Sequence, residues 1–227
     1  MRALVWEAPR VMAIREQDTP APGAGEALVR VSFAGICGSE LGGYLGHNAL
    51  RVPPLVMGHE FSGVVAALGE GAAARNPGLA VGKSVTVNPL SSCQACAYCQ
   101  RGAGHLCAQR RLLGAHRPGA YAEYVLAPAE SVVPLPEGLG PREGALAEPV
   151  AVAVRIGELA GPVAGETIFI AGAGPIGLLA LQVLRRLGAG PVFVSDLEPA
   201  RLAMAEELGA RPILASREDA AKVVREA

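Results

Sequence analysis

The chain has 227 residues, of which 51% are hydrophobic, and its formal net charge is −1. This composition supports a folded core and excludes an intrinsically disordered chain. The balanced charge and the low aromatic content of 4% argue against nucleic acid or an acidic membrane surface as a partner.

The N-terminal stretch MRALVWEAPRVMAIREQ alternates in polarity and carries several charges. It lacks the apolar core and the small-residue cleavage site of a signal peptide. No other segment approaches the roughly 18 apolar residues that cross a bilayer. We expect a cytoplasmic protein with neither a membrane nor a nucleic acid as its partner.

Short β segments separated by turns dominate residues 1–135. The clearest candidate strands cover residues 27–33, 61–68, 83–89 and 120–128, with glycine- and proline-rich turns between them. Many short strands at this spacing predict a barrel or a folded-over sheet.

Two polar interruptions fall inside this β-rich region. Cys37 follows the first of those strands in SFAGICGSE, and His59 and Glu60 interrupt the apolar run LVMGHEFSGVV. Such a cysteine is most often a small buried hydrophobe, and such a His-Glu pair is most often a solvated bend. Together the three residues offer sulfur, nitrogen and oxygen donors, a mixed set typical of catalytic zinc.

A second group of thiols lies in SCQACAYCQRGAGHLC, where Cys93, Cys96, Cys99 and Cys107 have the spacing C-x2-C-x2-C-x7-C. Four sulfurs with no open position predict a structural zinc site. Two disulfides in so short a segment would be strained and disfavoured in the cytosol, and an iron–sulfur cluster is a further alternative. His105 is expected to be solvated, because four sulfurs complete the coordination.

The pattern changes near residue 141, where REGALAEPVAVAVRIGELAG has a helical composition. Pro149 disfavours α geometry at Glu148, so we expect the helix to break there and the Glu148 carboxylate to turn inward as a candidate fourth zinc ligand. From residue 165 the order strand, glycine turn, helix, strand, helix predicts the beginning of a parallel sheet. We therefore divide the chain at residue 150.

The glycine turn GAGPIG, residues 172–177, fits the dinucleotide pattern G-x-G-x-x-G, follows a predicted strand and opens a predicted helix. Its glycines would allow a tight turn, a close approach of the pyrophosphate and close helix–strand packing. Asp196, at the end of the next strand, would accept the ribose hydroxyls of NAD and repel the 2′-phosphate of NADP, although a helix N-cap is the alternative. The predicted cofactor-binding residues are Gly172, Gly174, Pro175, Ile176, Gly177, Asp196 and Arg201.

The stretches AGICGSE, GHEFSGVV, ALAEPVAVA and AGAGPIG, with the four-cysteine lobe, together resemble the medium-chain zinc-dependent alcohol dehydrogenases. The closest resemblance is to their polyol, butanediol and threonine dehydrogenase branch. It implies an α/β plus β fold class, with a GroES-like β-barrel catalytic domain at residues 1–150 and a partial Rossmann domain, a doubly wound parallel sheet, at residues 151–227. It also implies zinc and NAD as cofactors, two zinc sites per chain, and hydride transfer to NAD from a secondary alcohol or polyol.

The resemblance further implies roles for single residues. The ligands of the catalytic zinc would be Cys37, His59, Glu60 and Glu148, with the two glutamates alternating with water. Ser39 would pass the alcohol proton outward, and a plain turn hydroxyl is the alternative for it. Glu40 departs from the family pattern, in which an aspartate usually orients the zinc histidine.

The length also departs from the family. Residues 165–227 hold about two βα units at roughly 30 residues each, whereas a six-stranded dinucleotide domain needs about three times that length. We therefore expect a C-terminally truncated chain without the family's dimer-forming sheet edge, and a homo-oligomer for the full-length form. The alternatives are an inactive fragment that retains zinc, a zinc-free quinone reductase of the same superfold, and a zinc-ribbon module that binds a protein partner.

Overall fold

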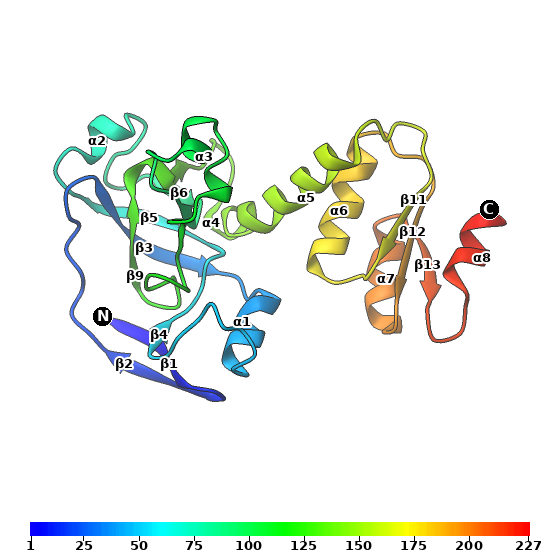
Figure 1. The fold of residues 1–227 in the computed structure, drawn as a ribbon, viewed down its shortest axis with the longest axis horizontal. Helices are drawn as coiled ribbons and strands as arrows, with labels where there is room; N and C mark the ends of the chain where they lie inside the picture. The colour runs from blue at the N-terminus through cyan, green and yellow to red at the C-terminus, as the bar shows by residue number, and fades with distance from the viewer. The chain divides into compact units, whose positions relative to one another are not determined.

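The computed structural model describes residues 1–227, which divide into two compact units, Met1–Glu148 and Pro149–Ala227. Figure 1 shows a β-rich N-terminal unit and a C-terminal unit in which helices alternate with parallel strands. None of the helices combines the length and the apolar character that would let it span a membrane.

An antiparallel five-stranded sheet, in the order β10-β6-β5-β3-β9, lies at the centre of the N-terminal unit. Val29 of β3 pairs with Val65 of β5 on one side and with Val125 of β9 on the other, and all three side chains are buried in the main core. Two irregularities interrupt the β3–β5 ladder, the second of them between Val31 and Phe33. The strands are β3 (Glu26–Ala34), β5 (Phe61–Leu68), β6 (Ser84–Val87), β9 (Tyr124–Pro128) and β10 (Val132–Pro134).

A smaller antiparallel sheet in the order β2-β1-β4 carries the N-terminus. Its strands are β1 (Arg2–Ala8), β2 (Val11–Glu16) and β4 (Leu55–Val56). Because β4 belongs to this sheet and β5 to the larger one, His59 and Glu60 lie where the chain passes from one sheet to the other. This crossing explains why two ionisable residues interrupt an apolar run.

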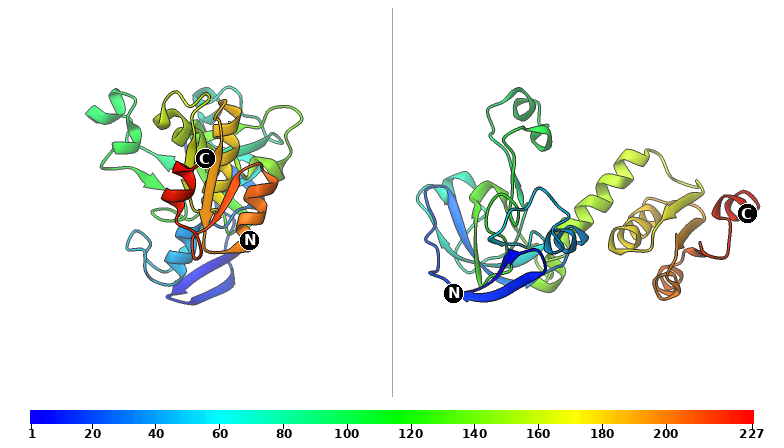
Figure 2. Two further views of the ribbon diagram at one scale, coloured as in Figure 1. Left: turned by 90° about the vertical axis from the view of Figure 1, so that its right-hand side faces the viewer. Right: turned by 60° about the horizontal axis from the view of Figure 1, so that its bottom comes forward.

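The cysteine-rich segment forms a lobe of its own at the end of a short hairpin. The hairpin pairs β7 (Leu90–Ser91) with β8 (Arg111–Leu112), and the loop between them holds α3 (Ala97–Gln100) and the 3-10 helix η1 (Gly104–Leu106). In the right-hand view of Figure 2 this green hairpin projects away from the sheets. The lobe therefore depends on local contacts for its shape. The remaining short helices of this unit are α1 (Gly38–Tyr44), α2 (Ala72–Arg75), η2 (Ala129–Ser131) and α4 (Pro141–Gly144).

The predicted helix break at Glu148 is wrong. The helix α5 (Ala147–Ala160) runs without interruption, and Glu148 lies inside its first turn. Pro149 is the third residue of α5, where the N–H of any residue would lack an intrahelical acceptor, so proline costs no hydrogen bond there. The break falls earlier, in the two residues between α4 and α5.

The C-terminal unit contains a parallel sheet in the order β11-β12-β13. Its core is apolar and includes Leu181, Val194 and Leu202. The predicted strand–turn–helix–strand–helix order is confirmed, but a third strand, β13, was missed because it has four residues and contains Pro212. A proline is tolerated there because β13 is an edge strand. The elements are β11 (Ile168–Ala171), α6 (Pro175–Arg186), β12 (Val192–Asp196), α7 (Pro199–Glu207), β13 (Arg211–Leu214) and α8 (Ala220–Arg225).

Candidate functional site

Cys37, His59 and Glu60 form a cluster in which one ligand atom from each side chain lies within 4.8 Å of the other two. The β3–β5 ladder brings them together, since Ala34 pairs with Phe61 at its end, and the Gly35 N–H donates to the Glu60 carbonyl at 2.7 Å. His59 and Glu60 are buried, with exposed fractions of 6% and 9%. Strand pairing therefore fixes the cluster, in which the imidazole and the carboxylate are buried and Cys37 is half-buried.

Two glycines give this cluster its space. Gly58 has φ +98°, a conformation that strongly favours glycine, and a Cβ there would lie 2.7 Å from the ring of Tyr121. A Cβ at Gly35 would overlap the carboxylate of Glu60. The glycine before His59 is therefore required by the backbone as well as by the packing.

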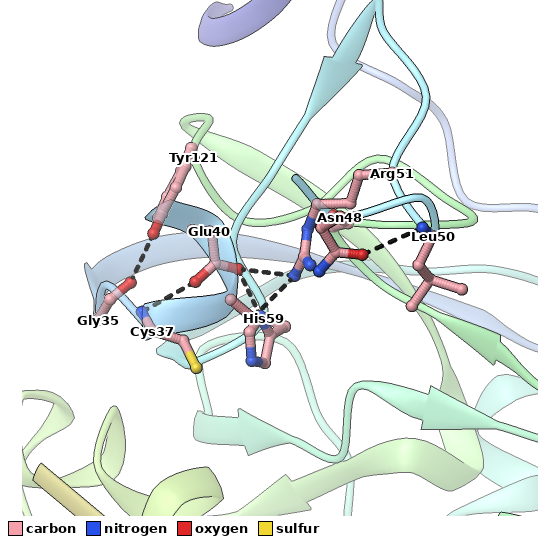
Figure 3. Close-up of polar contacts among 10 residues, drawn as sticks. Gly35, Cys37, Glu40, Asn48, Leu50, Arg51, His59 and Tyr121 are labelled. Atoms are coloured by element: carbon pink, nitrogen blue, oxygen red, sulfur yellow. Dashed lines mark hydrogen bonds and ion pairs between the residues drawn. The ribbon is translucent and has the colours of Figure 1, made fainter. Parts of the chain in front are cut away.

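Glu40 connects two members of the cluster (Figure 3). Its Oε2 accepts a hydrogen bond from the backbone N–H of Cys37 at 2.8 Å, the capping-box arrangement of a glutamate at the third position of α1. Its Oε1 lies 2.5 Å from Nδ1 of His59. A carboxylate at Nδ1 fixes the tautomer of the imidazole and leaves Nε2 available to a metal ion.

The pKa shifts of this group follow from burial and from the contact with Glu40. Burial lowers the pKa of His59, but the hydrogen bond and the charge of Glu40 outweigh that effect, so the net shift is upward. Burial raises the pKa of Glu40, but the hydrogen bond and charge of His59 outweigh it, so the net shift is downward. For Glu60 burial dominates and the pKa is raised. Glu40 is therefore more readily ionised than Glu60.

The donors present fit a zinc ion, because thiolate, imidazole and carboxylate are its common protein ligands. Glu148 is not a member of the cluster of three, but its charge contributes to the raised pKa of His59. Ser39 lies on α1, and its Oγ accepts a hydrogen bond from Nη2 of Arg51 at 3.1 Å.

Arg51 is a site residue that the sequence reasoning missed. Its side chain is 1% exposed and contacts the carboxylate of Glu40 at 3.4 Å. The only sequence signal is a cation just before the apolar segment VPPLVM.

The four cysteines of the lobe also meet, with their sulfurs within 4.8 Å of one another. The Sγ atom of Cys99 lies 3.8 Å from that of Cys93 and 3.5 Å from that of Cys96. A tetrahedral zinc ion with bonds of about 2.3 Å holds its sulfurs about 3.8 Å apart, so the lobe fits this ion. Backbone N–H groups of Ala95 and Cys96 lower the pKa of Cys93 to about 6, which favours the thiolate. His105 is exposed and outside the group, as expected for a solvated residue.

The glycine-rich turn is open at Gly174 and closely packed at Gly177. Gly172 has φ +102°, and a Cβ at Gly174, the N-cap of α6, would meet nothing within 4 Å. A Cβ at Gly177, in contrast, would collide with the carbonyl oxygen of Gly172. Pro175 is the first residue of α6 and Ile176 the second. The space in front of Gly174, at a helix N-terminus, fits a phosphate group.

Asp196 is the last residue of β12 and binds the turn directly. Its Oδ2 accepts from the Ala173 N–H at 2.8 Å, and its Oδ1 accepts from the Glu198 N–H at 2.9 Å. These backbone donors lower the pKa of Asp196. The guanidinium of Arg201 lies 3.8 Å from Oδ2 and is largely exposed. Asp196 does not cap α7, whose N-cap is Glu198. Each of its carboxylate oxygens accepts one backbone N–H, and each has a further lone pair that can accept another hydrogen bond.

Residues 23–137 match the alcohol dehydrogenase GroES-like domain, and residues 175–227 match the zinc-binding dehydrogenase domain. The starvation-sensing protein RspB of Escherichia coli K12 is 38% identical over 92% of this chain and 61% of its own length. A sorbitol dehydrogenase of Halalkalibacterium halodurans is 36% identical over 87% of this chain and 57% of its own length. The chain thus spans about three fifths of the length of these curated relatives.

A solved structure of the rspB protein from E. coli CFT073, described as a short chain alcohol dehydrogenase complexed with NADH, superposes with a TM-score of 0.91. It is 37% identical, and the match covers all of this chain and 66% of that one.

Proposed function

Since the chain belongs to the medium-chain zinc-dependent alcohol dehydrogenase family, we propose that it carries the catalytic zinc and dinucleotide sites of an enzyme that oxidises a secondary alcohol or polyol with NAD. The observation that carries this proposal is the cluster of Cys37, His59 and Glu60, whose ligand atoms lie within 4.8 Å of one another. A zinc-free reductase would not need a thiol, an imidazole and a carboxylate brought together in this way.

A zinc ion bound at this cluster would act as a Lewis acid that lowers the pKa of an alcohol hydroxyl. Cys37 and His59 would hold the ion, with Glu40 keeping Nε2 of His59 free for it. Glu60 and Glu148 are the carboxylates that would alternate with water as further ligands. Ser39 would accept the alcohol proton and pass it towards solvent.

The C-terminal unit would bind the dinucleotide. Gly172, Gly174 and Gly177 would allow the pyrophosphate to approach the N-terminus of α6, where Pro175 and Ile176 begin the helix. Asp196 would accept hydrogen bonds from the ribose hydroxyls, and Arg201 would contact the adenosine end. The charge of Asp196 favours NAD over NADP.

The cysteine lobe would hold a second, structural zinc ion. Cys93, Cys96, Cys99 and Cys107 supply four sulfurs, and a closed shell of four sulfurs leaves no position for a substrate. The substrate class rests on the sorbitol dehydrogenase relative and on the carboxylates beside the cluster. A polyol, a vicinal diol and threonine each offer a hydroxyl next to a second polar group.

The test is an assay of the zinc-loaded protein with NAD and a panel of sorbitol, 2,3-butanediol, L-threonine and ethanol, monitored for NADH formation. We expect turnover of at least one substrate with two adjacent polar groups, and loss of that turnover in Cys37→Ala with the circular dichroism unchanged. Zinc-free protein that reduces quinones with NADPH would instead support a quinone reductase. Zinc and NADH binding without any turnover would support an inactive fragment.

A further inference from the structure

Arg51 and His59 are the two buried basic residues of this chain. Arg51 lies in the loop between α1 and β4, and its side chain is 1% exposed. Removing a guanidinium from water costs several kcal/mol unless its N–H groups find acceptors. A buried charge of this kind is therefore stable only where acceptors surround its N–H groups.

The guanidinium of Arg51 has three acceptors from two parts of the chain, and Figure 3 shows its contact with one of them, Glu40. Its Nη2 donates to Oγ of Ser39 at 3.1 Å and to Oε1 of Glu40 at 3.4 Å. Its Nε donates to the backbone carbonyl of Gly114 at 3.1 Å. The planar fork of arginine reaches all three acceptors at once, which the single ammonium of lysine does not do.

The surrounding backbone leaves room for this side chain. A Cβ at Gly43 of α1 would lie 2.8 Å from Cδ of Arg51. Gly114 has φ +73° and approaches Gly58, since a Cβ on Gly114 would lie 2.8 Å from the Gly58 nitrogen. Arg51 therefore connects α1 with the loop that packs against the residue preceding His59.

The same oxygen of Glu40 faces both Arg51 and Nδ1 of His59. The guanidinium thus limits where this oxygen can lie, and the oxygen in turn sets the orientation of the imidazole. Arg51 also donates to the Ser39 hydroxyl, which is the acceptor in this contact.

We propose that Arg51 is a positioning residue that locks Glu40, and through it His59, in the orientation in which Nε2 faces a metal ion. This inference rests on the proposed zinc site. Arg51 would not touch the metal, the substrate or the dinucleotide. Its effect would be on the affinity of the Cys37–His59–Glu60 cluster for zinc and on the ligand field of the bound ion.

The test compares Arg51→Lys and Arg51→Met with the unaltered protein by competition with a chelator for zinc and by the visible spectrum after cobalt substitution. Loss of a contact that orients a metal ligand typically costs about 10- to 100-fold in metal affinity, and we expect Arg51→Met to lose that much and Arg51→Lys to lose less. The cysteine lobe is the internal control, because its zinc affinity should not change. Arg117→Met is the matched control, because the guanidinium of Arg117 pairs with Glu26, which is not part of the cluster. The distance between Nη2 of Arg117 and Oε1 of Glu26 is 2.5 Å.

Wild-type zinc affinity and an unchanged cobalt spectrum in both Arg51 variants would overturn the inference. If Arg51→Met fails to fold, Gly43→Ala replaces it, because the added methyl displaces the Arg51 side chain without removing its charge.

The nitrogen NMR spectrum of the His59 imidazole in the metal-free protein distinguishes failure of the positioning role from failure of the proposed function. If the unaltered protein binds zinc only in the lobe, the proposed function fails, and an altered His59 imidazole spectrum in Arg51→Met, or in Gly43→Ala where that variant replaces it, would still establish the positioning role. An unaltered imidazole spectrum in that variant would overturn it.

Discussion

Glu40 contacts two of the proposed ligands of the candidate zinc site. Its carboxylate accepts from the backbone of Cys37 at one oxygen and faces the imidazole of His59 with the other. A glutamate at the third helical position is the residue that completes a capping box. Glu40, which stands in place of the usual aspartate, therefore both caps the start of α1 and orients His59.

Asp196 gives a prediction at the scale of one residue. Its lowered pKa keeps it ionised at neutral pH, so Asp196→Ala removes a charged acceptor from the ribose. Charge-assisted hydrogen bonds are worth roughly 1.5–3 kcal/mol, so NADH affinity should fall by about tenfold or more, while NADPH affinity should not fall. Isothermal titration with each dinucleotide measures both.

The matched control for Asp196→Ala is Asp219→Ala. Asp219 also accepts two backbone N–H groups, at the start of α8, but it lies outside the predicted dinucleotide residues. This variant should lose comparable stability and keep its preference for NADH. If the unaltered protein bound NADH and NADPH with equal affinity, the proposal that Asp196 selects NAD would be wrong.

The strand–turn–helix from β11 to α6 is the element that the dinucleotide proposal requires. Gly174→Ala adds a methyl group where no protein atom lies within 4 Å and where φ is −75°, so the melting temperature should not change. The methyl would occupy the space proposed for the pyrophosphate, and NADH affinity should fall about tenfold or more.

Gly177→Ala is the contrasting change in the same element. Its methyl would collide with the carbonyl oxygen of Gly172. Overpacking costs about 1–3 kcal/mol, and a domain of this size loses roughly 4–8 °C in melting temperature per kcal/mol. A Gly174→Ala variant with unaltered NADH affinity would contradict the cofactor proposal, whatever Gly177→Ala does.

Elements with strong local signals could be predicted from the sequence, and elements defined by distant partners could not. The strand at residues 61–68 matches β5 because its apolar pattern and flanking turns are local. β13 has four residues and a proline, and it is a strand only because β12 lies beside it. In the same way Cys37, His59 and Glu60 were recognisable as metal donors. Arg51 was not, because its three acceptors meet only in the folded chain.

At the scale of the whole chain, the two groups of metal donors are built on different supports. The cluster of Cys37, His59 and Glu60 depends on the main sheet, whereas the four cysteines belong to the hairpin lobe. We expect two zinc ions per chain, with Cys37→Ser losing one and Cys96→Ser losing the other. Metal analysis of the purified variants measures this, and the simultaneous loss of both ions in either variant would contradict independent sites.

The pairing of β3 with β5 has a consequence for how the chain folds. The ladder contains two irregularities and ends at Ala34 and Phe61, just before the thiol and just after the carboxylate. A slip of one residue turns every side chain of a strand to the opposite face of its sheet. A misaligned ladder would therefore separate the donors, so capture of the metal ion would report, and then preserve, the correct alignment of the two strands.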